Sequence, residues 1–73
     1  MPLSKATTGT IVKLKDILGG QRFTNRLLEL GLTQGVKVKI YDSKGSGPIV
    51  IGVRGSKFAI GRTMADKIFV EVA

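Results

Sequence analysis

The chain contains neither cysteine nor histidine. Without cysteine it has no disulfide, no thiolate nucleophile and no thiolate metal site. Without histidine it lacks the usual general base, proton shuttle and imidazole metal ligand. We therefore expect a protein that acts by binding and is not an enzyme.

Acidic side chains are also scarce, with 5 Asp and Glu against 12 Lys and Arg and a formal net charge of +7. The carboxylates are Asp16, Glu29, Asp42, Asp66 and Glu71. None is paired at a spacing that would suggest acid and base roles or a hard-metal cage, so we expect no metal site and no cofactor. The positive charge favours nucleic acid, anionic lipid or an acidic protein surface as the partner, and does not choose among them.

Long hydrophobic runs are missing as well. No window approaches the roughly eighteen apolar residues of a membrane span, and residues 1–10 lack the apolar core of a signal peptide. We therefore expect a cytoplasmic protein. With 73 residues and no internal repeat, we expect a single domain, residues 1–73, with a small core.

The middle of the chain predicts one short helix over about residues 22–30. Its apolar face, spaced at i, i+4 and i+7, consists of Phe23, Leu27 and Leu30. Gly31 follows where a helix ends in a left-handed residue, and Leu32 stands where an apolar side chain packs back onto the last turn. Residues 33–36 fit a type II turn, because Gly35 can take the positive φ that its third position requires.

Alternating apolar and polar residues predict several strands. Residues 8–17 contain buried Val12 and Leu14 between outward Lys13 and Lys15. After the turn, the inward residues are Val36, Val38 and Ile40, and the outward residues are Lys37, Lys39 and Tyr41. The second strand therefore turns a cationic face to solvent.

The segment 49–60 predicts a hairpin. We place its two-residue turn at Gly55 and Ser56, the type that needs glycine first, so that Val53 faces Phe58. Residues 42–48 are predicted as a loop and 62–67 as one helical turn. A last strand follows, with Ile68, Val70 and Val72 facing inward.

These elements predict a mainly β fold with one short helix, a small barrel of about five strands. We expect it to be closed or nearly closed, with the last strand pairing with the first and removing the sheet edges. This is the architecture of an SH3-like β-barrel. Phe69 and Leu28 fall on outward positions, where they need either structural cover, for example by Pro2 and Leu3, or a partner.

Residues 26–36 resemble the signature of the FeoA family, the small ferrous iron transport protein A, which is close to R-L-x-E-L-G-L-x-P-G-x-x-V. The matching residues are Arg26, Leu27, Glu29, Leu30, Gly31, Leu32, Gly35 and a nearby valine. Gln34 stands where the family usually has proline, a mild departure because glutamine is allowed at that turn position. The resemblance covers nearly everything after Thr8 and implies the SH3-like fold.

The resemblance also implies a function. It indicates a cytoplasmic accessory protein of ferrous iron transport that docks on the FeoB transporter, at its cytoplasmic GTP-binding part, and reaches the membrane only through that transporter. For the contact we predict the exposed helix side, with Arg22, Arg26, Leu28 and Glu29. The second choice is the strand face with Lys37, Lys39 and Tyr41, together with Arg62.

Two alternatives remain open. Small basic barrels often bind nucleic acid nonspecifically through phosphate contacts, although Tyr41 is the only clear outward aromatic on a cationic strand. A similar barrel also occurs at the C-terminus of iron-dependent transcription regulators, where it serves as an intramolecular interaction domain. The chain has no DNA-binding helices, so it would not be a complete regulator.

Overall fold

The computed structural model describes residues 1–73. A short 3-10 helix, η1 (Leu3–Lys5), precedes strand β1 (Ile11–Ile17), and helix α1 (Gln21–Glu29) links β1 to β2 (Lys37–Asp42). Strands β3 (Ile49–Val53) and β4 (Ser56–Ile60) form a hairpin. The short helix α2 (Arg62–Ala65) then leads into β5 (Ile68–Val72).

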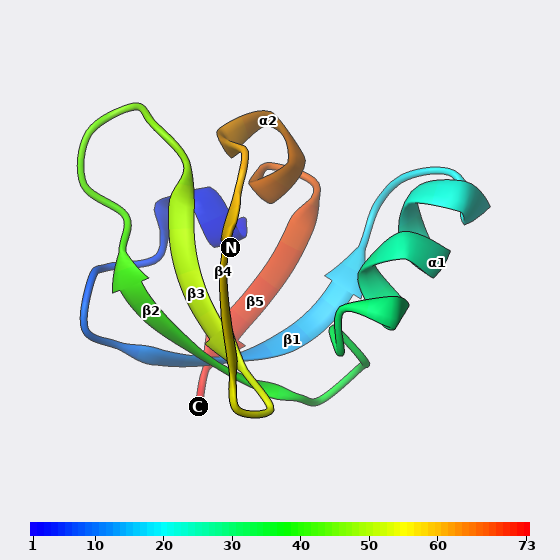
Figure 1. Ribbon diagram of the computed structural model, residues 1–73, viewed down its shortest axis with the longest axis horizontal. Coiled ribbons are helices and arrows are strands. Elements are labelled where there is room, and N and C mark those ends of the chain that lie inside the picture. Colours follow the sequence, from blue (N-terminus) through cyan, green and yellow to red (C-terminus); the bar gives the residue numbers. More distant parts are fainter.

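The five strands form one antiparallel sheet in the order β4-β3-β2-β1-β5. Figure 1 shows the sheet curling around a centre, with α1 at one side and α2 with η1 at one end. The last strand pairs with the first, as predicted, and Val12 lies opposite Val72. The sheet is not closed, however, because β4 and β5 do not pair with each other. The prediction that closure removes the sheet edges is therefore wrong.

The outer edge of β5 is partly occupied by the N-terminal residues. The Met1 ammonium group donates to the carbonyl oxygen of Val70 at 2.9 Å, and the Val70 amide donates to the carbonyl oxygen of Met1 at 2.8 Å. Pro2 forms an isolated bridge with Phe69, which is half-buried. This arrangement supports the structural cover predicted for Phe69, and it places Met1 and Pro2 where a closed barrel would place β4.

The hydrophobic core lies inside the curled sheet and is closed at its ends by η1, α1 and α2. Inward residues of the strands provide most of it, as the alternation predicts. The buried core residues are Leu3, Ala6, Val12, Leu14, Leu27, Leu32, Val38, Ile40, Ile49, Ile51, Val53, Ile60, Ala65, Ile68 and Val70.

Two apolar residues predicted to face inward are exposed instead. Leu30 is 42% exposed, because it caps α1 beyond the last packed turn and Leu32 enters the core in its place. Val72 is 80% exposed, because it lies at the end of the edge strand β5. The helical face therefore consists of Phe23 and Leu27 only.

The hairpin register differs from the prediction. Val53 lies opposite Ser56, and Ile51 lies opposite Phe58, so the turn residues are Arg54 and Gly55. Both have positive φ, 49° and 83°, which is typical of a type I′ turn. The predicted turn at Gly55 and Ser56 is therefore displaced by one residue.

Candidate functional site

The end of α1 is fixed by local hydrogen bonds. The Leu32 amide donates to the Leu27 carbonyl and the Gly31 amide to the Leu28 carbonyl, both at 3.0 Å. These are the two bonds of a Schellman cap, and Gly31 has the expected positive φ of 94°. Leu27 and Leu32 are both fully buried. This cap fixes which side of α1 faces the sheet and which side faces solvent.

Arg22 and Arg26 lie together on the exposed surface of α1. They line one open hollow, whose apolar lining includes Phe23 and Met64. Phe23 and Met64 also pack against the core, so this lining is anchored. The Lys67 ammonium lies 5.7 Å from the centre of the Phe23 ring. The result is an apolar depression with a cationic rim, which we call the α1 hollow.

The two arginines repel each other along the helix. They stand at i and i+4, where like charges destabilise a helix by about 0.2–0.5 kcal/mol. Arg22 is also in the first turn, which contains no acidic residue, and the helix dipole disfavours positive charge there. Arg26 lies in the last turn, where the dipole favours a cation, so only the position of Arg22 has no explanation in the stability of the helix.

Leu28 and Glu29 are exposed but do not belong to the α1 hollow. Leu28 is 44% exposed and lines a separate hollow with Thr24 of α1 and residues of β1 that include Leu14 and Ile17. Glu29 is exposed in the last turn of α1. The structure thus brings Arg22 and Arg26 together and places Leu28 on another flank of the same helix.

The second predicted surface lies on the outside of the sheet and centres on β2. Lys37, Lys39 and Tyr41 alternate along β2 and are all exposed. Lys13 of β1 lies directly opposite Lys37. On the other side, Gly52 of β3 links Lys39 to Lys57 of β4, since Lys39 pairs with Gly52 and Gly52 with Lys57. We call the set Lys13, Lys37, Lys39, Tyr41 and Lys57 the outer β2 face.

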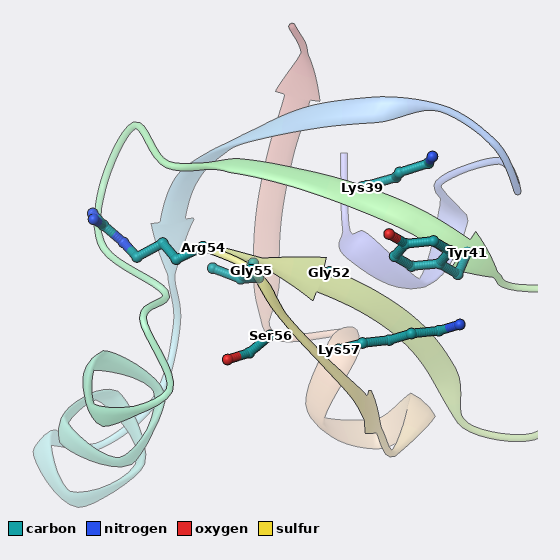
Figure 2. A pocket seen from close by; sticks show the side chains of 8 residues that line it. Lys39, Tyr41, Gly52, Arg54, Gly55, Ser56 and Lys57 are labelled. Carbon is teal, nitrogen blue, oxygen red and sulfur yellow. The ribbon is translucent and has the colours of Figure 1, made fainter.

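Tyr41 is held between two lysines. The Lys39 ammonium lies 5.0 Å and the Lys57 ammonium 4.4 Å from the centre of its ring. Figure 2 shows the ring between these two side chains. The ring also lies against Gly52, where a Cβ atom would be only 2.6 Å from Cε2 of Tyr41. A shallow pocket lined by these residues continues to the β3–β4 turn.

Arg62, predicted as part of the second contact surface, has a structural role. Its guanidinium donates to the carbonyl oxygens of Ser4 at 3.0 Å, Ser43 at 3.1 Å and Gly47 at 3.2 Å. It therefore connects α2 to η1 and to the loop between β2 and β3. Because its donors are used in this way, we do not include Arg62 in either candidate surface.

Sequence spacing does not predict that Arg54, Lys57 and Gly52 adjoin these surfaces. Arg54 donates to the Gly31 carbonyl at 3.3 Å and to the Thr33 hydroxyl at 2.8 Å, and so ties the hairpin tip to the end of α1. Lys57 and Gly52 belong to the outer β2 face through sheet register. A correct position for the hairpin turn would have placed Lys57 beside Gly52.

The carboxylates form no common centre. No three metal-ligating side chains of the His, Cys, Asp or Glu type lie together. Asp66 accepts a hydrogen bond from the Ser4 hydroxyl at the junction of η1 and α2. The absence of metal binding and of catalysis stays a prediction. None of the helices has the length and the apolar character that a membrane span requires.

Comparison with known proteins gives consistent matches over the whole length. The model of the FeoA domain family matches residues 1–72. The "Putative Fe(2+) transport protein A" of Methanocaldococcus jannaschii is 40% identical over 72 residues, which span 99% of this chain and 87% of that protein.

Two solved structures show the same fold. The crystal structure of an iron uptake regulatory protein, FeoA, has a TM-score of 0.92 at 36% identity and covers 100% of this chain and 97% of its own. The zinc complex of Stenotrophomonas maltophilia FeoA, described as a prokaryotic SH3 domain protein, has a TM-score of 0.84 at 24% identity and covers 97% and 89%. The predicted SH3-like fold is thereby confirmed.

Proposed function

The chain belongs to the FeoA family of ferrous iron transport accessory proteins, and from this membership we propose that it docks on the FeoB transporter in the cytoplasm. The contact is made with the GTP-binding part of that transporter, and the α1 hollow is the surface that makes it. The Stenotrophomonas maltophilia relative is described as a possible ferrous iron transport activating factor, which agrees with an accessory role for this chain.

The observation that carries this assignment is the pairing of an apolar depression with a cationic rim. Partner-binding surfaces combine an apolar centre with a polar rim and are enriched in aromatic residues, methionine and arginine. Phe23 and Met64 supply the apolar centre, and Arg22 and Arg26 supply the rim. An apolar side chain of the partner, flanked by carboxylates, fits this chemistry.

The test is the affinity of the chain for the isolated GTP-binding part of FeoB, measured by biolayer interferometry without lipid. Arg22→Glu with Arg26→Glu converts attraction at the rim into repulsion, which costs several kcal/mol in an interface, so we expect a loss of at least about a hundredfold. The control is Lys5→Glu with Lys44→Glu, which changes the net charge equally at exposed residues outside α1. We expect it to bind like the unchanged protein.

Two results would contradict the proposal. Failure of the unchanged protein to bind would remove the proposed partner. Normal binding by the Arg22 and Arg26 double variant would exclude the α1 hollow as the contact. Leu28→Asp tests the other flank of the helix. We expect it to weaken binding less than the Arg22 and Arg26 double variant does.

Nucleic acid binding, the alternative suggested by the net charge, has less support. Binders of single strands stack bases on free aromatic faces. On the outer β2 face the only aromatic residue is Tyr41, and its ring is already approached by two lysine ammonium groups.

A further inference from the structure

The outer β2 face concentrates positive charge on one side of the sheet. Lys13 and Lys37 are direct cross-strand neighbours, an arrangement in which like charges destabilise a sheet. Lys39 and Lys57 both approach the same tyrosine ring. Four of the chain's ammonium groups therefore share one side of a small sheet.

Acidic side chains do little to neutralise this face. Asp16 accepts a hydrogen bond from the Ile17 amide at 2.8 Å, and Asp42 accepts one from the Lys44 amide at 3.0 Å, so both carboxylates are turned toward backbone amides of their own segments. Glu71 of β5, opposite Lys13, is the acid that lies in register with the face. Glu71 offsets one of the four lysine charges, and the charge of Lys37, Lys39 and Lys57 is left for a partner of opposite sign.

The cationic residues of the outer β2 face are lysines and not arginines, and this difference indicates the chemical class of the partner. Lysine is depleted in the centres of protein interfaces, whereas arginine is enriched there because its planar fork pairs with carboxylates. All cations of the outer β2 face are lysines on flexible stems, and Arg54 at its margin is already bound to Gly31 and Thr33. Clustered lysines attract the diffuse negative potential of anionic lipid headgroups without needing fixed geometry.

Two exposed side chains on this side of the sheet suit a lipid headgroup region. Ile11, opposite Lys39, is 49% exposed, and Tyr41 is 42% exposed. Tyrosine favours the interface between membrane and water, because its ring is apolar and its hydroxyl is polar. Gly52, which has no side chain, leaves room for this ring, and a lysine lies on either side of the ring.

We propose that the outer β2 face binds the surface of a membrane that contains anionic phospholipids. This inference goes beyond docking on the transporter and uses a different surface. Contact through β2 leaves α1 free, so the same molecule can lie on the lipid and present the α1 hollow to a protein partner.

The experiment measures binding to vesicles of phosphatidylcholine with phosphatidylglycerol, and to vesicles of phosphatidylcholine alone, by co-sedimentation. The first variant is K37Q/K39Q/K57Q, on the outer β2 face. The matched control is K5Q/K44Q/K67Q, which removes three exposed lysines from other parts of the surface. Each variant has a formal charge of +7 − 3 = +4. Circular dichroism verifies that both are folded.

Each lysine near an anionic surface strengthens binding by about fivefold, so we expect the first variant to bind the mixed vesicles about a hundredfold more weakly. We expect the control to stay within about fivefold of the unchanged protein, and phosphatidylcholine alone to bind none of the three. Because Tyr41 is the only tyrosine and the chain has no tryptophan, its fluorescence reports directly on this face and should change when mixed vesicles are added.

Equal weakening of both variants would overturn the proposal, because it would mean attraction by net charge alone. Unchanged Tyr41 fluorescence on vesicle binding would also overturn it. So would stronger binding to poly-L-glutamate or to a single-stranded oligonucleotide at the same concentration of negative charge, which would assign the face to an acidic protein or a nucleic acid. Binding of K37Q/K39Q/K57Q to the GTP-binding part of FeoB without lipid should remain normal, which separates this proposal from the proposed function.

Discussion

Arg62 allows the sharpest test of how the fold is held together. Its guanidinium joins α2 to two other segments, since it donates to the carbonyl oxygens of Ser4, Ser43 and Gly47. Replacing it with alanine removes all three hydrogen bonds at once. The loop between β2 and β3 would then lose its connection to α2.

A net value of about 1.5–3 kcal/mol applies to a hydrogen bond with a charged donor. The three bonds share one half-buried side chain, and the carbonyls can bind water once the side chain is gone, so their contributions do not add fully. We therefore expect Arg62→Ala to lower the free energy of unfolding by about 2–3 kcal/mol. For a domain of this size the melting temperature should fall by about 10–20 °C.

The assay is thermal and urea unfolding followed by circular dichroism, because the chain has no tryptophan. Arg62→Lys is the informative companion variant. It keeps the charge, but one ammonium group cannot reach three carbonyls in the geometry of the guanidinium fork, so it should recover less than half of the lost stability. The reasoning fails if Arg62→Ala changes the free energy of unfolding by less than about 0.5 kcal/mol, or if Arg62→Lys matches the unchanged protein.

Two glycines give further predictions, with Gly47→Ala as their common control, since a Cβ at Gly47 meets no atom within 4 Å. Gly31→Ala should lower the free energy of unfolding by about 1–3 kcal/mol, because φ is 94° there and the new methyl would lie 3.3 Å from Cδ of Arg54; urea unfolding checks this, and a loss no larger than that of the control would contradict it. Gly52→Ala should displace the Tyr41 ring, because the new Cβ would lie 2.6 Å from it. Tyrosine fluorescence and the ring proton shifts should both change, and an unaltered spectrum would refute the packing described for this ring.

Local patterns were enough to predict the elements that depend on neighbouring residues. Gly31 and Leu32 form the predicted helix cap, and the Val36 amide closes the predicted turn on the Thr33 carbonyl at 3.1 Å. The alternation along β2 placed the lysines outside and Val38 inside. For the cap and the turn, the determining contacts lie within a few residues along the chain.

The register of the β3–β4 hairpin is a feature that local sequence patterns do not determine. A shift of the turn by one residue keeps Val53 and Phe58 on the same side of the sheet, so alternation fits both registers equally well. The observed register places Arg54 at φ 49°, and its side chain binds Gly31 and Thr33, residues of a distant turn. No pattern of neighbouring residues in the sequence predicts the contact of Arg54 with Gly31 and Thr33.

The candidate surfaces depended in the same way on distant residues. Leu28 and Phe69 both fall on outward positions, yet Phe69 meets Pro2 from the other end of the chain whereas Leu28 remains exposed. Arg62 is predicted as part of the second-choice contact surface, and in the structure it donates hydrogen bonds to three backbone carbonyls. Sequence spacing alone therefore does not predict whether an outward side chain is free to contact a partner or is held by distant parts of the chain.

The strand order has a consequence for biosynthesis. Strands β2, β3 and β4 pair with their neighbours in sequence, but β1 needs β5, and Val12 must find Val72. Pairings between such distant segments form late, because a long stretch of polypeptide must first be brought together. While the ribosome is still adding residues, one flank of β1 stays bare, and we expect chaperones to engage the nascent protein there until β5 arrives.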